Sequence, residues 1–195
     1  LYATSLKNNT PELTPSPFDK NRDGLVIGEG AGTLVLEEYE HAKKRGAKIY
    51  VEIIGFGTST DGTHITNPNY KTMGKALELS LKDANISPDE IGYVSAHGTG
   101  TYAGDIAETK ATEEIFKRPV PVSSLKSYTG HTLGACGSIE AITAIDMMHR
   151  KWFNPTLNLN EVDNECGKLD YIKNQGREID TNIVMSNNFA FGGIN

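Results

Sequence analysis

The sequence has little cysteine and no long apolar run. Its two cysteines, Cys136 and Cys166, are too few for a disulfide-stapled scaffold, so a reducing, cytoplasmic setting is the default expectation. No apolar stretch approaches the ~20 residues that a membrane helix needs, and we therefore expect no membrane span. The first residues show no basic-then-apolar pattern, so a secretory leader is not indicated.

Positive charge is also scarce. The chain has 19 lysine and arginine residues against 25 aspartate and glutamate residues, which gives a net charge of -6 and a pI near 5.4. This acidic balance argues against nucleic acid as the main partner. Hydrophobic residues at 37% and charged residues at 23% are ordinary for a globular protein, and 195 residues can form one domain with part of a second.

The order of apolar patterns predicts an α/β layered fold, because short apolar runs alternate with segments of helical periodicity. The expected strands are 33–36, 48–59, 92–96, 120–124, 168–173 and 182–186. The expected helices are 37–45, 71–84, 105–116 and 133–150. The chain starts without methionine and ends just after a glycine pair, so we expect it to be a piece of a longer protein.

Three of the expected strands are followed by unusual polar or glycine-rich segments. They are HGTGT at 97–101, KSYTGH at 126–131 and NNFAFGG at 187–193. Ligands of α/β sheets bind beyond the carboxyl ends of strands, and glycine lets the backbone approach a ligand closely. We therefore expect two histidines, a lysine, two threonines and a phenylalanine of these segments to meet at one site.

Two other kinds of site are not supported by the spacing of the residues. GEGAG at 28–32 lacks the G-x-G-x-x-G pattern of a dinucleotide site. The five histidines show no paired zinc spacing and neither cysteine lies in a C-x-x-C, so a structural zinc is not expected.

Four motifs together carry a family resemblance. PFDKNRDGLVIGEGAG, HGTGT, KSYTGH followed by LGACGSIEA, and SNNFAFGGIN occur in this order over nearly the whole chain. In this the sequence resembles the β-ketoacyl synthases, in particular the elongating 3-oxoacyl-[acyl-carrier-protein] synthases of the type II fatty-acid system. The stretch LVLEEYEHAKKRGAKIY strengthens the resemblance to the bacterial enzymes.

The resemblance implies a fold and an activity. The fold is thiolase-like, with a mixed sheet flanked by helices, and residues 1–46 would end the N-terminal domain while 47–195 would form a C-terminal domain without its last strand. The activity is acyl transfer by decarboxylative Claisen condensation with malonyl-acyl carrier protein, in fatty acid or polyketide biosynthesis. The carrier protein is the implied partner and brings the phosphopantetheine, no cofactor is implied for the chain itself, and the full-length enzyme would be a homodimer.

The resemblance also implies roles for individual residues. His97 and His131 would hydrogen-bond the malonyl thioester oxygen, and Lys126 would orient the site electrostatically. The start of the helix after His131 would keep that imidazole neutral. Thr99 and Thr101 would contact the pantetheine arm. Glu140 would pair with the lysine, and Phe191 would lie near the acyl pocket. Some family members hold a monovalent cation behind the histidines, and the matching groups are Ser95, Glu108, Glu140, Ser186 and Asn187.

Departures from the family pattern leave alternatives open. The family's nucleophilic cysteine lies in the N-terminal half, so this chain alone is expected to be inactive, and Cys136 is interpreted as a small buried packing residue. HGTGT, Tyr128 and the SNNFAFGGIN ending leave the product open between a fatty acid, a polyketide and a polyene. A non-catalytic chain-length-factor partner is the main alternative, against which His97, Lys126 and His131 argue. A thiolase would need a C-terminal C-x-G cysteine, which the sequence lacks.

Overall fold

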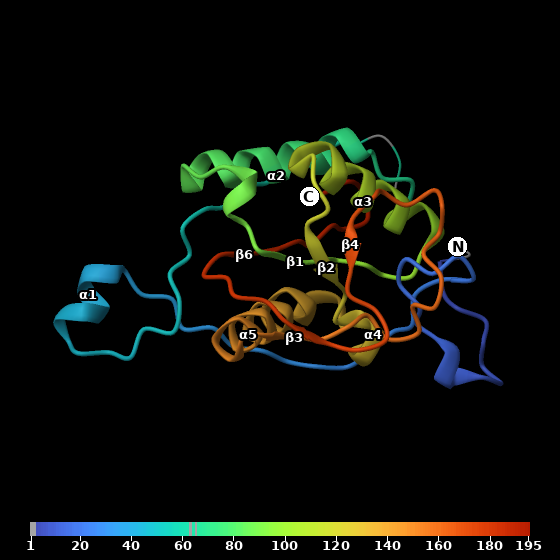
Figure 1. Cartoon of the computed structure of the whole chain (residues 1–195), viewed down its shortest axis with the longest axis horizontal. Coiled ribbons are helices and arrows are strands. Elements are labelled where there is room, and N and C mark those ends of the chain that lie inside the picture. Colours follow the sequence, from blue (N-terminus) through green and yellow to red (C-terminus); the bar gives the residue numbers. More distant parts are fainter. Residues whose placement is uncertain (1–2, 63, 65) are drawn as a thin grey trace.

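A parallel sheet lies between two groups of helices in the computed structural model, which describes residues 3–62, 64 and 66–195 (Figure 1). Its strand order is β4-β2-β1-β6, namely Asp170–Tyr171, Pro121–Ser123, Tyr93–Ser95 and Val184–Ser186. All three pairings in this sheet are parallel. A second, antiparallel sheet pairs β3 (Trp152–Phe153) with β5 (Arg177–Glu178). Both senses of pairing are therefore present, and the α/β prediction is confirmed.

The helices cover both faces of the parallel sheet. One face is covered by α2 (Tyr70–Ala84) and α3 (Tyr102–Phe116), and the other by α4 (Lys126–Thr129) and α5 (Cys136–Arg150) (Figure 1). Short 3-10 turns are η1 (Pro11–Leu13), η2 (Pro88–Glu90) and η3 (Leu133–Ala135), and α1 (Tyr39–Lys44) lies apart from the sheet. None of the helices in the part of the chain that is described has the length and apolar character needed to cross a bilayer.

Helix α2 illustrates how local sequence sets an element's bounds. The Asn69 side chain accepts a hydrogen bond from the Lys71 N–H and caps the start, and Asn85 ends the helix in the left-handed conformation. Met73, Leu77 and Leu81, spaced at four, are buried against the sheet core around Val94 and Val122. The predicted helix at 71–84 is therefore confirmed to within one residue.

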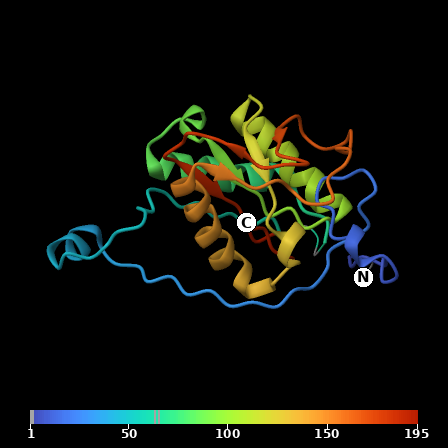
Figure 2. The same ribbon diagram turned by 60° about the horizontal axis from the view of Figure 1, so that its bottom comes forward.

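Two predicted strands, 33–36 and 48–59, are wrong. Residues 32–38 and 47–59 have no regular secondary structure, and the segment that carries α1 extends away from the sheet (Figure 2). Their apolar side chains are largely exposed: Val35 is 83% exposed and Phe56 is 72% exposed. A strand needs hydrogen-bonded neighbours. Residues 50–57 have none among the described residues on the side that faces residues 182–187, because a cavity of about 830 Å³ lies between these two segments.

The other predicted elements are confirmed with shifted bounds. The strands predicted at 92–96, 120–124, 168–173 and 182–186 are shorter, and the helix predicted at 105–116 starts earlier, at Tyr102. The helix predicted at 133–150 is split, because Leu133 has a positive φ of 53° and the 3-10 turn η3 precedes α5. The helix predicted at 37–45 is one residue shorter at its end and begins at Tyr39.

The segment 17–32, which is the first motif, ties together the loops that follow β1 and β2. The Gly24 N–H donates to the Gly100 carbonyl, and the His131 N–H donates to the Val26 carbonyl at 2.7 Å. Asp19 accepts from the backbone N–H groups of Asn160 and Glu161. These bonds bring the first, second and third motifs to the carboxyl edge of the sheet, where the candidate site lies.

Candidate active site

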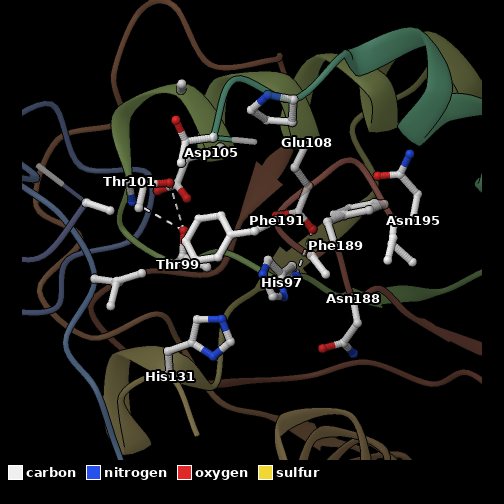
Figure 3. Close-up of a pocket in the computed structure, with 18 of the residues that line it drawn as sticks. His97, Thr99, Thr101, Asp105, Glu108, His131, Asn188, Phe189, Phe191 and Asn195 are labelled. Carbon is white, nitrogen blue, oxygen red and sulfur yellow. Dashed lines mark hydrogen bonds between the residues drawn. The ribbon is translucent and has the colours of Figure 1, made fainter. Parts of the chain in front are cut away.

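A cavity of about 780 Å³ opens at the carboxyl ends of the strands (Figure 3). It is lined by side chains from the loop after β1, from the turn between α4 and α5, and from the segment after β6. Among the residues predicted for the site, those that line it are His97, Thr99, Thr101, Glu108, His131 and Phe191. Lys126 and Glu140 are 1% exposed and lie behind His97. The structure thus brings the three motif segments into one place.

His97 is held as a neutral hydrogen-bond donor. Its Nδ1 lies 3.1 Å from Nζ of Lys126. The ammonium group of lysine can only donate hydrogen bonds, so Nδ1 is the acceptor and the ring proton lies on Nε2. Burial, followed by the positive charge of Lys126 and the neighbouring His131, holds the pKa of His97 well below its usual value. The ring therefore stays uncharged at neutral pH with an N–H available to a ligand.

His131 reaches the same state through a different partner. The backbone N–H of Leu133 donates to its Nδ1 at 3.1 Å, which again leaves the proton on Nε2. Burial, and secondarily the charge of Lys126, lowers the pKa of His131 to about 4. Burial thus has the larger effect, and the start of the following turn acts by fixing the tautomer. The two imidazole rings lie 5.2 Å apart between centroids, edge to face.

A buried ion pair stands behind the two rings. Lys126, the first residue of α4, pairs with Oε1 of Glu140, which lies one turn into α5. Burial raises the pKa of Glu140, an effect that Lys126 opposes. Among the described residues, the other carboxylate oxygen of Glu140, Oε2, is buried with no hydrogen-bond partner.

Two carboxylates of α3 hold the loop that carries His97. Glu108 accepts from the backbone N–H groups of His97 and Gly98 at 2.7 and 2.8 Å, and Asp105 accepts from that of Gly100 at 3.2 Å. Burial is the main cause that raises the pKa of Glu108 to about 7 and that of Asp105 to about 6. Asp105 was not predicted as a site residue, although its position one turn before Glu108 on the same helix face could have indicated it.

The remaining predicted contacts lie at the wall and mouth of the cavity. The hydroxyl groups of Thr99 and Thr101 are 2.9 Å apart. Phe191 is 55% exposed and stands in a loop where Gly192 and Gly193 have positive φ angles. The neighbouring Phe189, which was not predicted, is buried with its ring centroid 6.1 Å from that of His97.

Two of the five residues predicted for a monovalent cation, Glu108 and Glu140, accept other hydrogen bonds. Both oxygens of Glu108 accept backbone N–H groups, and Oε1 of Glu140 accepts from Lys126. Ser95 and Asn187 are buried, whereas Ser186 is exposed. Lys126 already compensates the charge of Glu140. The monovalent cation stays a prediction of the resemblance.

Cys136 and Asn188 are cavity residues that the sequence analysis did not assign to the site. Cys136 is buried, as expected, but its thiol lines the cavity and donates to Oδ1 of Asn188 at 3.0 Å. Its interpretation as a small buried residue is confirmed, and the structure adds this hydrogen bond to Asn188. Burial is the main cause that raises the pKa of the Cys136 thiol, so the nucleophilic thiolate is disfavoured.

Comparisons with known proteins agree with this geometry. Residues 50–160 match the β-ketoacyl synthase C-terminal domain. The chain is 46% identical to 3-oxoacyl-[acyl-carrier-protein] synthase 2 of Vibrio harveyi, over 99% of this chain and 48% of that protein. The crystal structure of a β-ketoacyl synthase from Burkholderia phymatum STM815 superimposes with a TM-score of 0.97 at 61% identity, over 99% of this chain and 47% of that one.

A third relative is the ketosynthase in the complex AntDE:AntF, described as a type II polyketide synthase acyl-carrier protein with its ketosynthase bound to the hexaketide. It superimposes with a TM-score of 0.89 at 38% identity, over 100% of this chain and 48% of that one. The chain thus spans about half the length of the relatives it matches. Together with the four motifs and the paired histidines, the domain match over residues 50–160 shows that the chain belongs to the β-ketoacyl synthase family.

Proposed function

We propose that the chain is the C-terminal part of an acyltransferase that elongates an acyl chain by decarboxylative Claisen condensation with malonyl-acyl carrier protein. The observation that carries this proposal is the pair of neutral imidazoles, His97 and His131, in one cavity. Each has its Nδ1 occupied and its Nε2 protonated, so both present N–H donors to a bound oxygen. Donors of this kind stabilise an oxygen on which negative charge develops.

The reaction needs such donors at its first step. The bond between the malonyl carboxylate and the α-carbon breaks, carbon dioxide leaves, and the electron pair stays behind as the enolate of the thioester. His97 and His131 hold the enolate oxygen, and Lys126 adds a positive charge behind His97. The enolate carbon then attacks the carbonyl of the acyl-cysteine, whose thiolate is the leaving group. The family resemblance implies that this cysteine lies in the N-terminal part of the enzyme. Cys136 is disfavoured for that role, because burial raises the pKa of its thiol.

Acyl carrier protein is the proposed partner and the source of the phosphopantetheine arm, for which the Thr99 and Thr101 hydroxyls at the cavity wall are the proposed contacts. Phe191 is proposed to border the acyl chain. The complex of the AntDE ketosynthase with its carrier protein supports this partner. We further propose a cytoplasmic homodimer for the full-length enzyme, with residues 1–46 in the N-terminal domain and 47–195 in the C-terminal domain.

The product class follows less directly than the reaction. Fatty acid and polyketide elongation share a carrier-bound malonyl unit, and relatives of both kinds match the chain. The proposed roles of the histidines are common to both. A non-catalytic chain-length-factor role is disfavoured, because the structure assembles His97, Lys126 and His131 in one connected set.

The test is carbon dioxide release from malonyl carrier protein by the full-length enzyme, run beside single-turnover acylation of its cysteine. His97→Ala and His131→Ala are each expected to slow carbon dioxide release about 10²–10³-fold, because each loses one preorganised donor, while acylation is affected less. His41→Ala, an exposed histidine on α1, is the control. Release of carbon dioxide at the parental rate by His97→Ala and His131→Ala would show that the proposed roles are wrong.

A further inference from the structure

Asn188 lies in the cavity wall, and the proposed reaction assigns no role to its side chain. It follows β6 by two residues and lines the cavity together with His97 and His131 (Figure 3). Cys136 also lines this cavity. The thiol of Cys136 donates to its Oδ1 at 3.0 Å. Because Cys136 is the first residue of α5, this bond ties the segment after β6 to the start of that helix.

A buried atom nearby points to what the amide does. Cys136 and Glu140 are one turn apart on α5 and therefore share a helix face. Glu140 is 1% exposed, and its Oε2 has no hydrogen-bond partner among the described residues. The Asn188 amide is close enough to lower the pKa of Glu140 and to raise that of His97. With Oδ1 engaged by the thiol, the NH₂ group of Asn188 remains to face Glu140, because a carboxylate oxygen accepts hydrogen bonds.

We propose that Asn188 is a positioning residue, whose amide is anchored by Cys136 and supports the Lys126–Glu140 ion pair that fixes His97. Hydrogen bonds join the thiol to the amide, Glu140 to Lys126, and Lys126 to Nδ1 of His97. The inferred link is the approach of the amide to Oε2 of Glu140, which lies one turn along α5 from Cys136 and has no hydrogen-bond partner among the described residues. If Glu140 moves, Lys126 follows its partner, and the bond that sets the His97 tautomer lengthens. The inference rests on the proposed function, because its first readout is carbon dioxide release.

If the hydrogen bond from Cys136 positions Asn188, a side chain without a donor at position 136 should lower activity. Alanine is also small but has no polar hydrogen to donate, whereas serine places a hydroxyl donor at the position of the thiol. A single hydrogen bond of this kind contributes about 0.5–1.5 kcal/mol, which corresponds to a factor of roughly 2 to 13 in rate or equilibrium. Loss of the whole Asn188 amide should cost more, because it also removes the support of a buried carboxylate.

The experiment measures kcat and KM for carbon dioxide release from malonyl carrier protein by the full-length enzyme. Asn188→Ala is expected to lower kcat by roughly 10-fold or more, because it removes the amide beside the buried Oε2 of Glu140, and to leave KM within about twofold. Cys136→Ala is expected to lower kcat by roughly 2- to 13-fold, and Cys136→Ser to restore it. The double variant should be no slower than Asn188→Ala, since the two residues act in series. Cys166→Ala, at the other buried cysteine, is the control.

A second readout separates failure of this inference from failure of the proposed function. In ¹⁵N spectra of the histidine rings, Asn188→Ala and the milder Asn188→Ser should shift the Nδ1 and Nε2 signals of His97, and Cys166→Ala should not. An enzyme that releases no carbon dioxide would contradict the proposed function, and the spectra would then decide the inference. Unshifted His97 signals in the folded Asn188 variants, or parental kcat in both Asn188→Ala and Cys136→Ala, would overturn it.

Discussion

At the scale of single residues, the site depends on which groups stay uncharged. His97 and His131 are both kept neutral by burial and by the charge of Lys126, and each has one ring nitrogen occupied by a donor. The carboxyls of Asp105 and Glu108 shift in the opposite sense, since burial raises the pKa of both. The site therefore avoids isolated charge, apart from the Lys126–Glu140 pair, and leaves two N–H donors for an anionic oxygen.

The lowered pKa of His131 predicts a pH dependence of stability. Its pKa of about 4 lies below the usual value of 6.5 for histidine, so between these pH values the unfolded chain binds a proton that the folded chain does not bind. The contribution of His131 to the free energy of unfolding is therefore lost as the pH falls from about 6.5 to about 4. In the full-length protein, the free energy of unfolding of the parent minus that of His131→Asn should fall as the pH falls through this window. Urea unfolding at each pH measures this difference.

Asp105 and Glu108 change the free energy of unfolding in the opposite direction over part of the same pH window. The difference between the parent and His131→Asn cancels these contributions, because both proteins contain the same two carboxyls. His41→Asn, at an exposed position on α1, is the control and should show no such trend. A constant difference between parent and His131→Asn from pH 7 to pH 4 would contradict the neutral state assigned to His131.

At the scale of elements, helices and strands differ in how far their own residues decide them. Helix α2 has its caps and its apolar stripe within 17 residues, from Asn69 to Asn85, so the local pattern is sufficient. Residues 48–59 have the β-branched and aromatic residues of a strand, yet they form none, because the cavity lined by residues 50–57 and 182–187 lies where a hydrogen-bonded neighbour would be needed. Residues 55–57 contact α2 instead: the Phe56 N–H donates to Asp83, and Gly55 and Gly57 lie against the helix backbone.

That contact predicts the effect of a small substitution. A Cβ at Gly57 would lie 2.2 Å from the Ala76 carbonyl oxygen and 2.4 Å from the Ser80 nitrogen, both backbone atoms of α2. Gly57→Ala should therefore lower the free energy of unfolding by about 1–3 kcal/mol, as overpacking does. Gly134→Ala is the matched control: a Cβ there meets nothing within 4 Å, and the change should be neutral or slightly stabilising. Equal stability of the two variants in urea unfolding would contradict the packing described for Gly57.

At the scale of the whole molecule, the chain holds one part of the proposed chemistry. It assembles two histidines, a lysine and two loop-holding carboxylates around one cavity. It also exposes apolar side chains along the segments that failed to form strands, such as Val35 and Phe56. The chain spans about half of each relative it matches, and the family's nucleophilic cysteine is expected in the other half.

The 195-residue chain by itself is therefore expected to have no condensing activity and to take no acyl group from acyl carrier protein. The physical reason is that burial is the main cause that raises the pKa of Cys136, and that its proton is engaged by Asn188. The measurement is intact-chain mass spectrometry after incubation with acyl carrier protein, with Cys136→Ser as the control. Stoichiometric acylation of the parent chain that is absent from Cys136→Ser would show that Cys136 is a nucleophile after all.

The sequence by itself determined the motifs, the family and the alternation of helices with strands. These depend on residues close together in the chain: HGTGT directly after a strand, the apolar stripe of α2, and the absence of any long apolar run. From them, the sequence analysis also named His97, His131, Lys126 and Glu140 as members of one site.

Only the tertiary structure decided how these groups act on one another. The bond from Cys136 to Asn188 joins residues 52 positions apart, and the bond from the Phe18 N–H to Asp105 joins residues 87 apart. Burial of His131 and the missing neighbour of residues 48–59 likewise depend on distant segments. Hydrogen-bond partners, burial and strand pairing are properties of groups brought together by folding, and no local pattern of residues specifies them.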